Sequence, residues 1–185
     1  FDMERFLSIA EASEGQFMPD TYFLSPFTTA PKVAALMREN FTKRIEPFLV
    51  EIESSGRGQE DILVMASLLE EEAATERDKY LISGILWKRL DDGMLLQVDA
   101  VFPYIIGKNS FDLTRSDLKV DSPYNTYLYE GLPPGPITNP GLEAILAALR
   151  PEESSHWFYL SDLYGRMHYA DTYEEHIANK KLYLD

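Results

Sequence analysis

The stretch that most constrains the fold of this chain is SPYNTYLYEGLPPGPITNPG, residues 122–141. Proline removes the backbone N–H that helices and sheets use, and glycine and asparagine favour turns, so these residues predict one long irregular loop. A loop of this length inside a compact domain is usually functional. Its prolines also reduce the conformational entropy that is lost when one shape is held, so LPPGPITNPG predicts a rigid wall.

Around this loop the spacing of apolar residues indicates an α+β fold without internal repeats. Helical spacing or helix-start signals predict helices over residues 3–13, 30–55, from 59 onward, 78–93, 140–151 and 172–184. Aromatic and β-branched residues predict short strands at 20–26, at 94–106 and on either side of a polar turn within 156–170.

Composition bounds the class of protein. A chain of 185 residues with 45% hydrophobic residues is enough for one domain with a real core. The 17 Lys and Arg against 31 Asp and Glu give a net charge of −14 without a basic cluster, which disfavours nucleic acid as a partner. The absence of cysteine excludes disulfides, thiolate nucleophiles and cysteine-based zinc sites. Three scattered histidines give little support to a histidine-based metal site.

The ends of the chain carry a separate expectation. No stretch reaches the ~20 apolar residues of a membrane span, and no signal-peptide pattern opens the sequence. Because the chain starts at Phe1 rather than at an initiator methionine, it is expected to be a piece of a longer protein from which any anchor was removed.

The helix beginning near residue 59 ends in three consecutive glutamates, and one of them is expected to face inward. At about 100° per residue, a single apolar stripe of this helix carries Met65, Leu68, Leu69, Glu72 and Glu76. The two preceding glutamates lie off that stripe. An acid on an apolar face is costly to ionise, so its pKa rises toward neutrality, which suits general acid–base catalysis. The alternative is that Glu72 lies at the rim of the core, reaching solvent or pairing with a lysine.

Four stretches of the sequence resemble one known family. They are EGQFMPDTYFL at 14–24, the pattern Ser-x-x-Glu-x-Glu at 67–72, RLDDGMLLQVD at 89–99, and YNTY with GLPPGPI and a Pro-Gly helix start within 122–141. Together they resemble the endolytic murein transglycosylases of the YceG-like (MltG) family over nearly the whole chain, from about Glu14 to the end.

The resemblance implies a function and a catalytic residue. The second glutamate of the family's motif is its catalytic acid, and the spacing places it at Glu72, the residue that helical geometry also selects. Members of the family cut the β-1,4 bond between N-acetylmuramic acid and N-acetylglucosamine inside glycan strands and leave a 1,6-anhydro ring, which terminates strand growth. The implied reaction needs no cofactor.

The resemblance also implies a setting. Residues 1–185 would be a catalytic domain whose N-terminal membrane helix and LysM-like region are missing, acting at the extracytoplasmic face of the bacterial cytoplasmic membrane. The expected partner is peptidoglycan, with cell-wall synthases (penicillin-binding proteins) as further candidates, and the membrane is reached only through the missing anchor.

The proposed groove places the Glu72 helix on one side and two later segments on the other. Its expected substrate-binding residues are Gln97, Asp99, Tyr104, Tyr124, Asn125, Thr126, Tyr127 and Asn139. Hydroxyl, amide and aromatic groups suit sugar hydroxyls, acetamido groups and pyranose stacking. Asp99 is the best candidate for a second carboxylate or for stabilising positive charge, and Gln97 and Asp99 share a face if this segment is a strand. The alternative for Asp99 is a hydrogen bond that anchors a turn.

The sequence departs from the family pattern in places. Ala100 and Val101 replace proline and threonine, and the family's C-terminal histidine falls on Met167 rather than His168. These departures leave open a non-catalytic glycan-binding or scaffold domain on the same fold. The family has also carried the label of a pyridoxal-phosphate lyase, but neither Lys88 nor Lys108 lies in the glycine-rich phosphate setting that such an enzyme needs.

Overall fold

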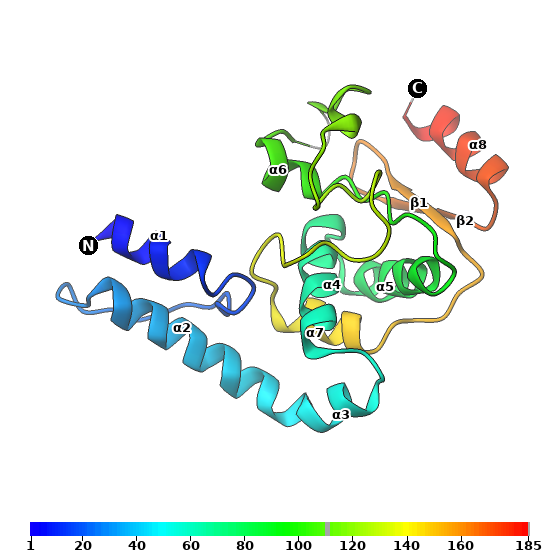
Figure 1. Ribbon diagram of the computed structural model, residues 1–185. Helices are drawn as coiled ribbons and strands as arrows, with labels where there is room; N and C mark the ends of the chain where they lie inside the picture. The colour runs from blue at the N-terminus through cyan, green and yellow to red at the C-terminus, as the bar shows by residue number, and fades with distance from the viewer. Residues whose placement is uncertain (110–111, 185) are drawn as a thin grey trace.

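The computed structural model describes residues 1–109 and 112–184 and confirms an α+β fold (Figure 1). Its α-helices are α1 Met3–Glu11, α2 Ala30–Ile45, α3 Leu49–Ser54, α4 Gln59–Glu72, α5 Glu76–Asp91, α6 Val101–Ile106, α7 Leu142–Leu149 and α8 Tyr173–Tyr183. The sheet is one antiparallel hairpin of β1 Phe158–Ser161 and β2 Met167–Ala170. No helix of these residues is long and apolar enough to cross a membrane.

The core is built around α4. Residues 62–69 of this helix are all buried, so α4 is covered on every side rather than along one stripe. It packs against α5 and α7, and the small residues Ala144, Ala147 and Ala148 let α7 approach closely. Because α4 is held in the core, the position of its last residue, Glu72, is fixed as well.

Gly84 in the middle of α5 lets another segment cross the helix. A Cβ atom at this position would lie 1.9 Å from the carbonyl oxygen of Glu152, in the segment that follows α7. The Glu152 N–H donates to the carbonyl of Tyr80, one turn earlier on α5, at 3.0 Å. Close backbone approach therefore explains a glycine inside a helix.

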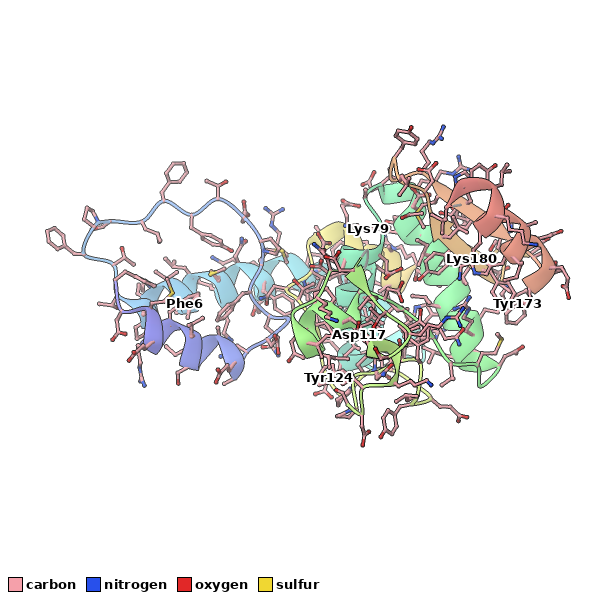
Figure 2. All side chains as sticks on the ribbon, turned by 90° about the horizontal axis from the view of Figure 1, so that it is seen from above. Phe6, Lys79, Asp117, Tyr124, Tyr173 and Lys180 are labelled. Atoms are coloured by element: carbon pink, nitrogen blue, oxygen red, sulfur yellow. The ribbon has the colours of Figure 1, made fainter. Side chains whose placement is uncertain are left out.

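The first two helices form an arm that extends away from this core (Figures 1 and 2). The segment between α1 and α2 contacts the long loop of residues 122–141. The N–H of Phe17 donates to Oδ1 of Asn139 at 2.9 Å, and Gly15, with a φ of +80°, approaches the ring of Pro136. The loop thus serves as a contact surface for the arm.

Most of the elements expected from the sequence are present. Helices α4, α7 and α8 and the β1–β2 hairpin all lie within their predicted ranges, whereas α5 begins at Glu76, two residues before its predicted range of 78–93. The expected helix over 30–55 is interrupted by a 3₁₀ turn, Glu46–Phe48, because Pro47 lacks the N–H that would continue the α-helical ladder.

Two strand predictions were wrong. Residues 20–26 form an irregular loop in which Asp20 accepts hydrogen bonds from Asn40 and Arg44, and no partner strand lies beside them in the described residues. Residues 94–106 begin without regular secondary structure and end as α6, with Pro103 in the first turn, where proline is tolerated. Gln97 has a φ of +52°, which breaks the strand geometry that would have placed it on one face with Asp99.

Candidate active site

Glu72 is the last residue of α4, and both of its carboxylate oxygens are held by other parts of the chain. Oε1 accepts a hydrogen bond from the backbone N–H of Ala100 at 3.1 Å. Oε2 accepts one from the hydroxyl of Tyr159 on β1 at 2.9 Å. The carboxyl therefore lies where α4, the segment before α6 and the hairpin meet.

Burial raises the pKa of the Glu72 carboxyl to about 7. The hydrogen bonds from Tyr159 and Ala100 act in the opposite direction because they favour the charged form, and the positive charge of Arg89 does the same. The negative charge of Asp99 raises the pKa further. Near neutral pH both protonation states are populated, which suits a group that must give up a proton and take one back.

The other two glutamates of the triplet face elsewhere. Glu71 is exposed. Glu70 forms an ion pair with Lys79 at 2.8 Å and accepts a longer hydrogen bond, 3.4 Å, from the N–H of Gly141. Glu72 is thus the inward-facing member of the three, which is the residue that the sequence selects. The single stripe expected to carry it is wrong, because residues 62–69 are buried on every side and the exposed Glu76 begins α5 instead of continuing α4.

Asp99 and Tyr127 form a second polar pair beside Glu72. The Tyr127 hydroxyl donates to Oδ1 of Asp99 at 2.5 Å. Burial raises the pKa of Asp99, and the hydrogen bond from Tyr127 opposes that rise. Burial and the charges of Asp99 and Glu72 raise the pKa of the Tyr127 hydroxyl, which remains a donor. The structure therefore brings Glu72, Asp99 and Tyr127 into one electrostatic cluster.

Arg89 holds together the segments that contact Glu72. Its buried guanidinium donates to the carbonyl of Leu96 at 2.6 Å and to that of Trp157 at 2.6 and 2.9 Å. Leu96 precedes the turn that presents the Ala100 N–H, and Trp157 lies two residues before Tyr159. One side chain thus connects both sources of hydrogen bonds to the carboxyl.

Three other predicted binding residues surround this cluster in different ways. Asn125 is fully buried, and its amide donates to the carbonyls of Leu118 and Val120. Thr126 is also buried and shares hydrogen bonds with the backbone of Val98. Gln97 is exposed. Substrate contact by Gln97 stays a prediction. The buried side chains of Asn125 and Thr126 bind the backbone of neighbouring segments, so their role is to hold the shape of the loop.

The remaining predicted residues lie along the contact with the arm. The rings of Tyr104 and Tyr124 approach to 4.8 Å between centroids, and the Tyr104 hydroxyl donates to Glu14 at 2.8 Å. Asn139 accepts from Phe17, as described above. These three share a region near residues 14–17 rather than the immediate surroundings of Glu72.

Sequence reasoning missed Tyr159, the Ala100 N–H and the role of Arg89. In the sequence, Arg89 is visible only as part of a family motif. Tyr159 stands in an aromatic run, FYL, in which no feature distinguishes the ring that meets a carboxylate from its neighbours. A backbone donor such as that of Ala100 carries no signal in the sequence.

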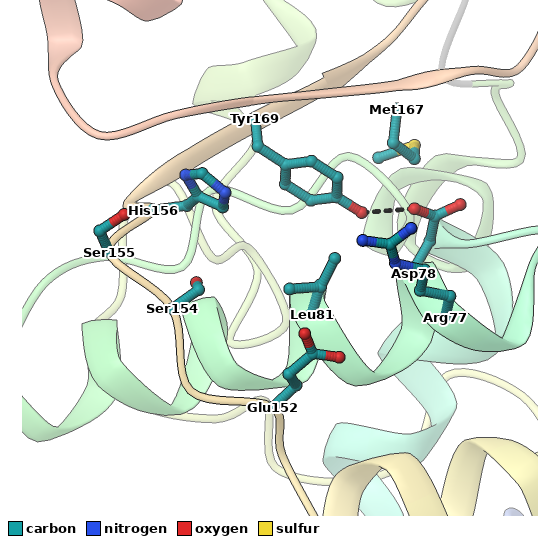
Figure 3. A pocket seen from close by; sticks show the side chains of 9 residues that line it. All are labelled: Arg77, Asp78, Leu81, Glu152, Ser154, Ser155, His156, Met167 and Tyr169. Atoms are coloured by element: carbon teal, nitrogen blue, oxygen red, sulfur yellow. Dashed lines mark hydrogen bonds between the residues drawn. The ribbon is translucent and has the colours of Figure 1, made fainter.

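A polar recess of about 510 Å³ lies on the α5 side of the hairpin and is lined by Arg77, Asp78, His156 and Tyr169 among others (Figure 3). Tyr169 donates to Asp78 at 2.5 Å across it. Met167, at the family's histidine position, lines the recess, whereas His168 contacts Asp162 at 3.1 Å. Among residues 1–109 and 112–184 no three acidic or histidine side chains are grouped closely enough to hold a metal ion.

Fold and site together define an α+β domain in which a carboxyl group with a pKa near 7 lies at the end of the central helix α4. The chain belongs to the YceG-like family, whose sequence profile matches residues 2–182. A Listeria monocytogenes protein described as putative and YceG-like has a similar crystal structure, with a TM-score of 0.84 and 32% identity over 96% of this chain and 64% of that one.

Two proteins named endolytic murein transglycosylase are also similar to this chain. The one from Bacillus subtilis strain 168 is 34% identical over 178 residues, which are 96% of this chain and 49% of the relative. The one from Streptococcus pneumoniae D39 is 32% identical over 172 residues, 90% of this chain and 31% of the relative. The chain therefore spans about half the length of the first and about a third of the second.

Proposed function

We propose that this domain is an endolytic lytic transglycosylase that cleaves the β-1,4 bond between N-acetylmuramic acid and N-acetylglucosamine within glycan strands and leaves 1,6-anhydro ends. The observation that carries the proposal is the Glu72 carboxyl, held at both oxygens and with its pKa raised to about 7. The names of the Bacillus and Streptococcus relatives supply the substrate class.

One carboxyl serves both halves of this reaction. Protonated Glu72 gives its proton to the glycosidic oxygen while the bond to the anomeric carbon breaks and its electron pair stays on the leaving oxygen. The 6-hydroxyl oxygen of the muramic acid then bonds to the anomeric carbon, and the Glu72 carboxylate takes the hydroxyl proton. Water is neither consumed nor released.

Asp99 is proposed to stabilise the positive charge that develops at the anomeric carbon. A glycosidase that uses two carboxylates and a water needs its second acid about 5–9.5 Å from the first, and Asp99 is the candidate for that role as well. Product analysis distinguishes the two reactions, because an anhydro end is one water lighter than a hydrolysed end.

The cellular setting belongs to the same proposal. A domain that cuts nascent glycan strands would terminate their elongation at the extracytoplasmic face of the cytoplasmic membrane, with cell-wall synthases as partners. Support comes from the cell-wall substrate named in the relatives.

A non-catalytic glycan-binding domain is the second candidate. Both Glu72 oxygens already accept hydrogen bonds within the protein, and Glu72 does not line the recess of Figure 3. A domain that only binds would retain glycan affinity without releasing anhydro ends.

Substitution Glu72→Gln separates these candidates. Glutamine keeps an acceptor for Ala100 and a partner for Tyr159 but cannot exchange a proton at neutral pH. Cleavage of uncrosslinked glycan strands, followed by mass spectrometry, is expected to fall about 10²–10⁴-fold while glycan affinity is kept. The exposed Glu71→Gln is the matched control and should keep its activity. Equal cleavage by wild type and Glu72→Gln would contradict the mechanism, and no cleavage by wild type would favour the binding domain.

A further inference from the structure

We propose that the Tyr159 hydroxyl is the positioning group of Glu72, holding its carboxyl in one orientation and favouring its ionised form. The inference rests on the proposed function for its effect on cleavage, but the hydrogen bond itself can be tested without activity.

The geometry gives Glu72 two fixed contacts from distant parts of the chain. Ala100 is 28 residues and Tyr159 is 87 residues away in sequence, and each binds a different oxygen. A glutamate at a helix end has several side-chain torsions free, and two anchors select one arrangement among them. Removing one anchor leaves the carboxyl free to turn about the other.

Tyr159 is itself held rigidly. Its strand β1 pairs with β2, and Arg89 donates a hydrogen bond to the carbonyl of Trp157, two residues before Tyr159. The Tyr159 ring lies 6.0 Å from the Arg89 guanidinium. Burial and the charge of Glu72 raise the pKa of the Tyr159 hydroxyl well above its ordinary value, so it remains a donor at neutral pH.

A neutral hydroxyl donates more strongly to a carboxylate than to a carboxylic acid. Tyr159 therefore lowers the pKa of Glu72 against the effect of burial. The other groups that face the carboxyl are Arg89 on α5, Asp99 in the segment before α6 and Tyr127 in the long loop. In the reaction, the bond strengthens when Glu72 has given up its proton and so stabilises the state between the two transfers.

The hairpin supplies a matched control. Tyr169 on β2 is directly opposite Tyr159 on β1, so both side chains lie on the same face of the sheet. Its hydroxyl also donates to a carboxylate, that of Asp78 (Figure 3), and makes no hydrogen bond to Glu72. Phenylalanine at either position removes one partly buried hydroxyl that donates to a carboxylate.

The test is a carbon NMR titration of the Glu72 carboxyl, assigned by its loss in Glu72→Gln. Tyr159→Phe is expected to raise the Glu72 pKa by about one to two units, since a hydrogen bond to a charged group is lost. Tyr169→Phe should leave this pKa unchanged. An unchanged or lowered pKa in Tyr159→Phe, or an equal rise in Tyr169→Phe, would overturn the inference.

Kinetics give the second measurement. In Tyr159→Phe the kcat for strand cleavage should fall about tenfold with little change in KM, and the alkaline limb of its pH profile should move up together with the Glu72 pKa. If wild type does not cleave, the proposed function fails while the titration still decides the role of Tyr159. If wild type cleaves but the titration shows no shift, the function stands and this inference fails.

NMR observation of Tyr159 itself tests the same hydrogen bond if Tyr159→Phe does not fold. In wild type the ring carbon that bears the Tyr159 hydroxyl should follow the ionisation of Glu72, with a midpoint near the Glu72 pKa of about 7. In Glu72→Gln that carbon should no longer titrate through the neutral range. A Tyr159 signal that titrates identically in both proteins would contradict the proposed bond.

Discussion

At the scale of single residues, Glu72 shows how opposed effects set one pKa. Loss of hydration disfavours the charged carboxylate, whereas two hydrogen bonds and the nearby Arg89 favour it. Desolvation is the largest effect, so the pKa rises, but the opposing contacts keep it near 7. A carboxyl without those contacts would stay protonated at neutral pH and could not act as a base.

The raised pKa of Glu72 predicts a pH dependence of stability. In the folded chain the pKa is about 7, against 4.5 for an unperturbed glutamate. Below the lower value both states are protonated and the full stability is present. Between the two values only the unfolded chain releases its proton, so stability falls as pH rises, and the loss is complete above the folded pKa.

Urea unfolding at several pH values tests this dependence. Relative to Glu72→Gln, which has no proton to lose, wild type should lose roughly 3 kcal/mol of unfolding free energy across that window, at about 1.4 kcal/mol per pKa unit. The shift of Asp99 is common to both proteins and largely cancels. A pH-independent difference between them would contradict the raised pKa.

At the scale of elements, the site depends on the segments that pack across α5 and hydrogen-bond to it. Gly84 admits the chain that leads from α7 to β1, and Arg89, five residues later, binds the segment before α6 and the residue that precedes β1. The same helix therefore aligns both partners of Glu72. Helix α5 thus positions the groups that bind Glu72, although within the described residues none of its own side chains forms a hydrogen bond with the Glu72 carboxyl.

Substitution Gly84→Ala should destabilise the protein. In an isolated helix alanine is favoured over glycine by about 1 kcal/mol. Here the added Cβ would meet the Glu152 carbonyl at 1.9 Å, so the crossing segment must move. We expect a loss of about 3 kcal/mol in unfolding free energy, measured by chemical denaturation.

The matched control for this substitution is Gly58→Ala at the start of α4. Its φ is −65°, and its nearest non-neighbouring atom would be the Asp61 side chain at 3.4 Å. A change smaller than about 1 kcal/mol is expected there. Equal effects of the two substitutions would show that the α5 crossing does not depend on a missing side chain.

At the scale of the whole molecule, the acidic composition acts on stability. A net charge of −14 on a folded domain produces self-repulsion that the unfolded chain relieves by expanding. Salt screens exposed charges beyond a Debye length of about 8–10 Å. The melting temperature should therefore rise when ionic strength is increased from a low to a physiological value.

Calorimetry in sodium and in potassium chloride checks the origin of that rise. Screening depends on ionic strength, so the two salts should give the same increase. A melting temperature that falls, or that responds to only one of the salts, would point to specific ion binding in place of general repulsion.

The sequence alone determined the elements whose signals are local. Helices α4, α5 and α7 follow from apolar spacing and from Pro or Gly near an end, and the hairpin follows from two aromatic runs around a polar turn. Helix α8 begins with the capping box of Thr172 and Glu175. The same apolar spacing selected Glu72 among the three glutamates, because a helix converts sequence separation directly into direction, but α4 is buried on every side over residues 62–69 and has no single inward face.

Only the tertiary structure decided what surrounds that residue. Residues 94–100 resemble a strand by composition, but a hydrogen bond from the Val98 N–H to the Thr126 hydroxyl and one from Arg89 to the Leu96 carbonyl replace those of a neighbouring strand. The Ala100 N–H and the Tyr159 hydroxyl reach Glu72 from 28 and 87 positions away, and one of them is a backbone group that every residue except proline has. Periodicity reports which face of an element is buried, but the partner on that face is set by how distant segments pack together.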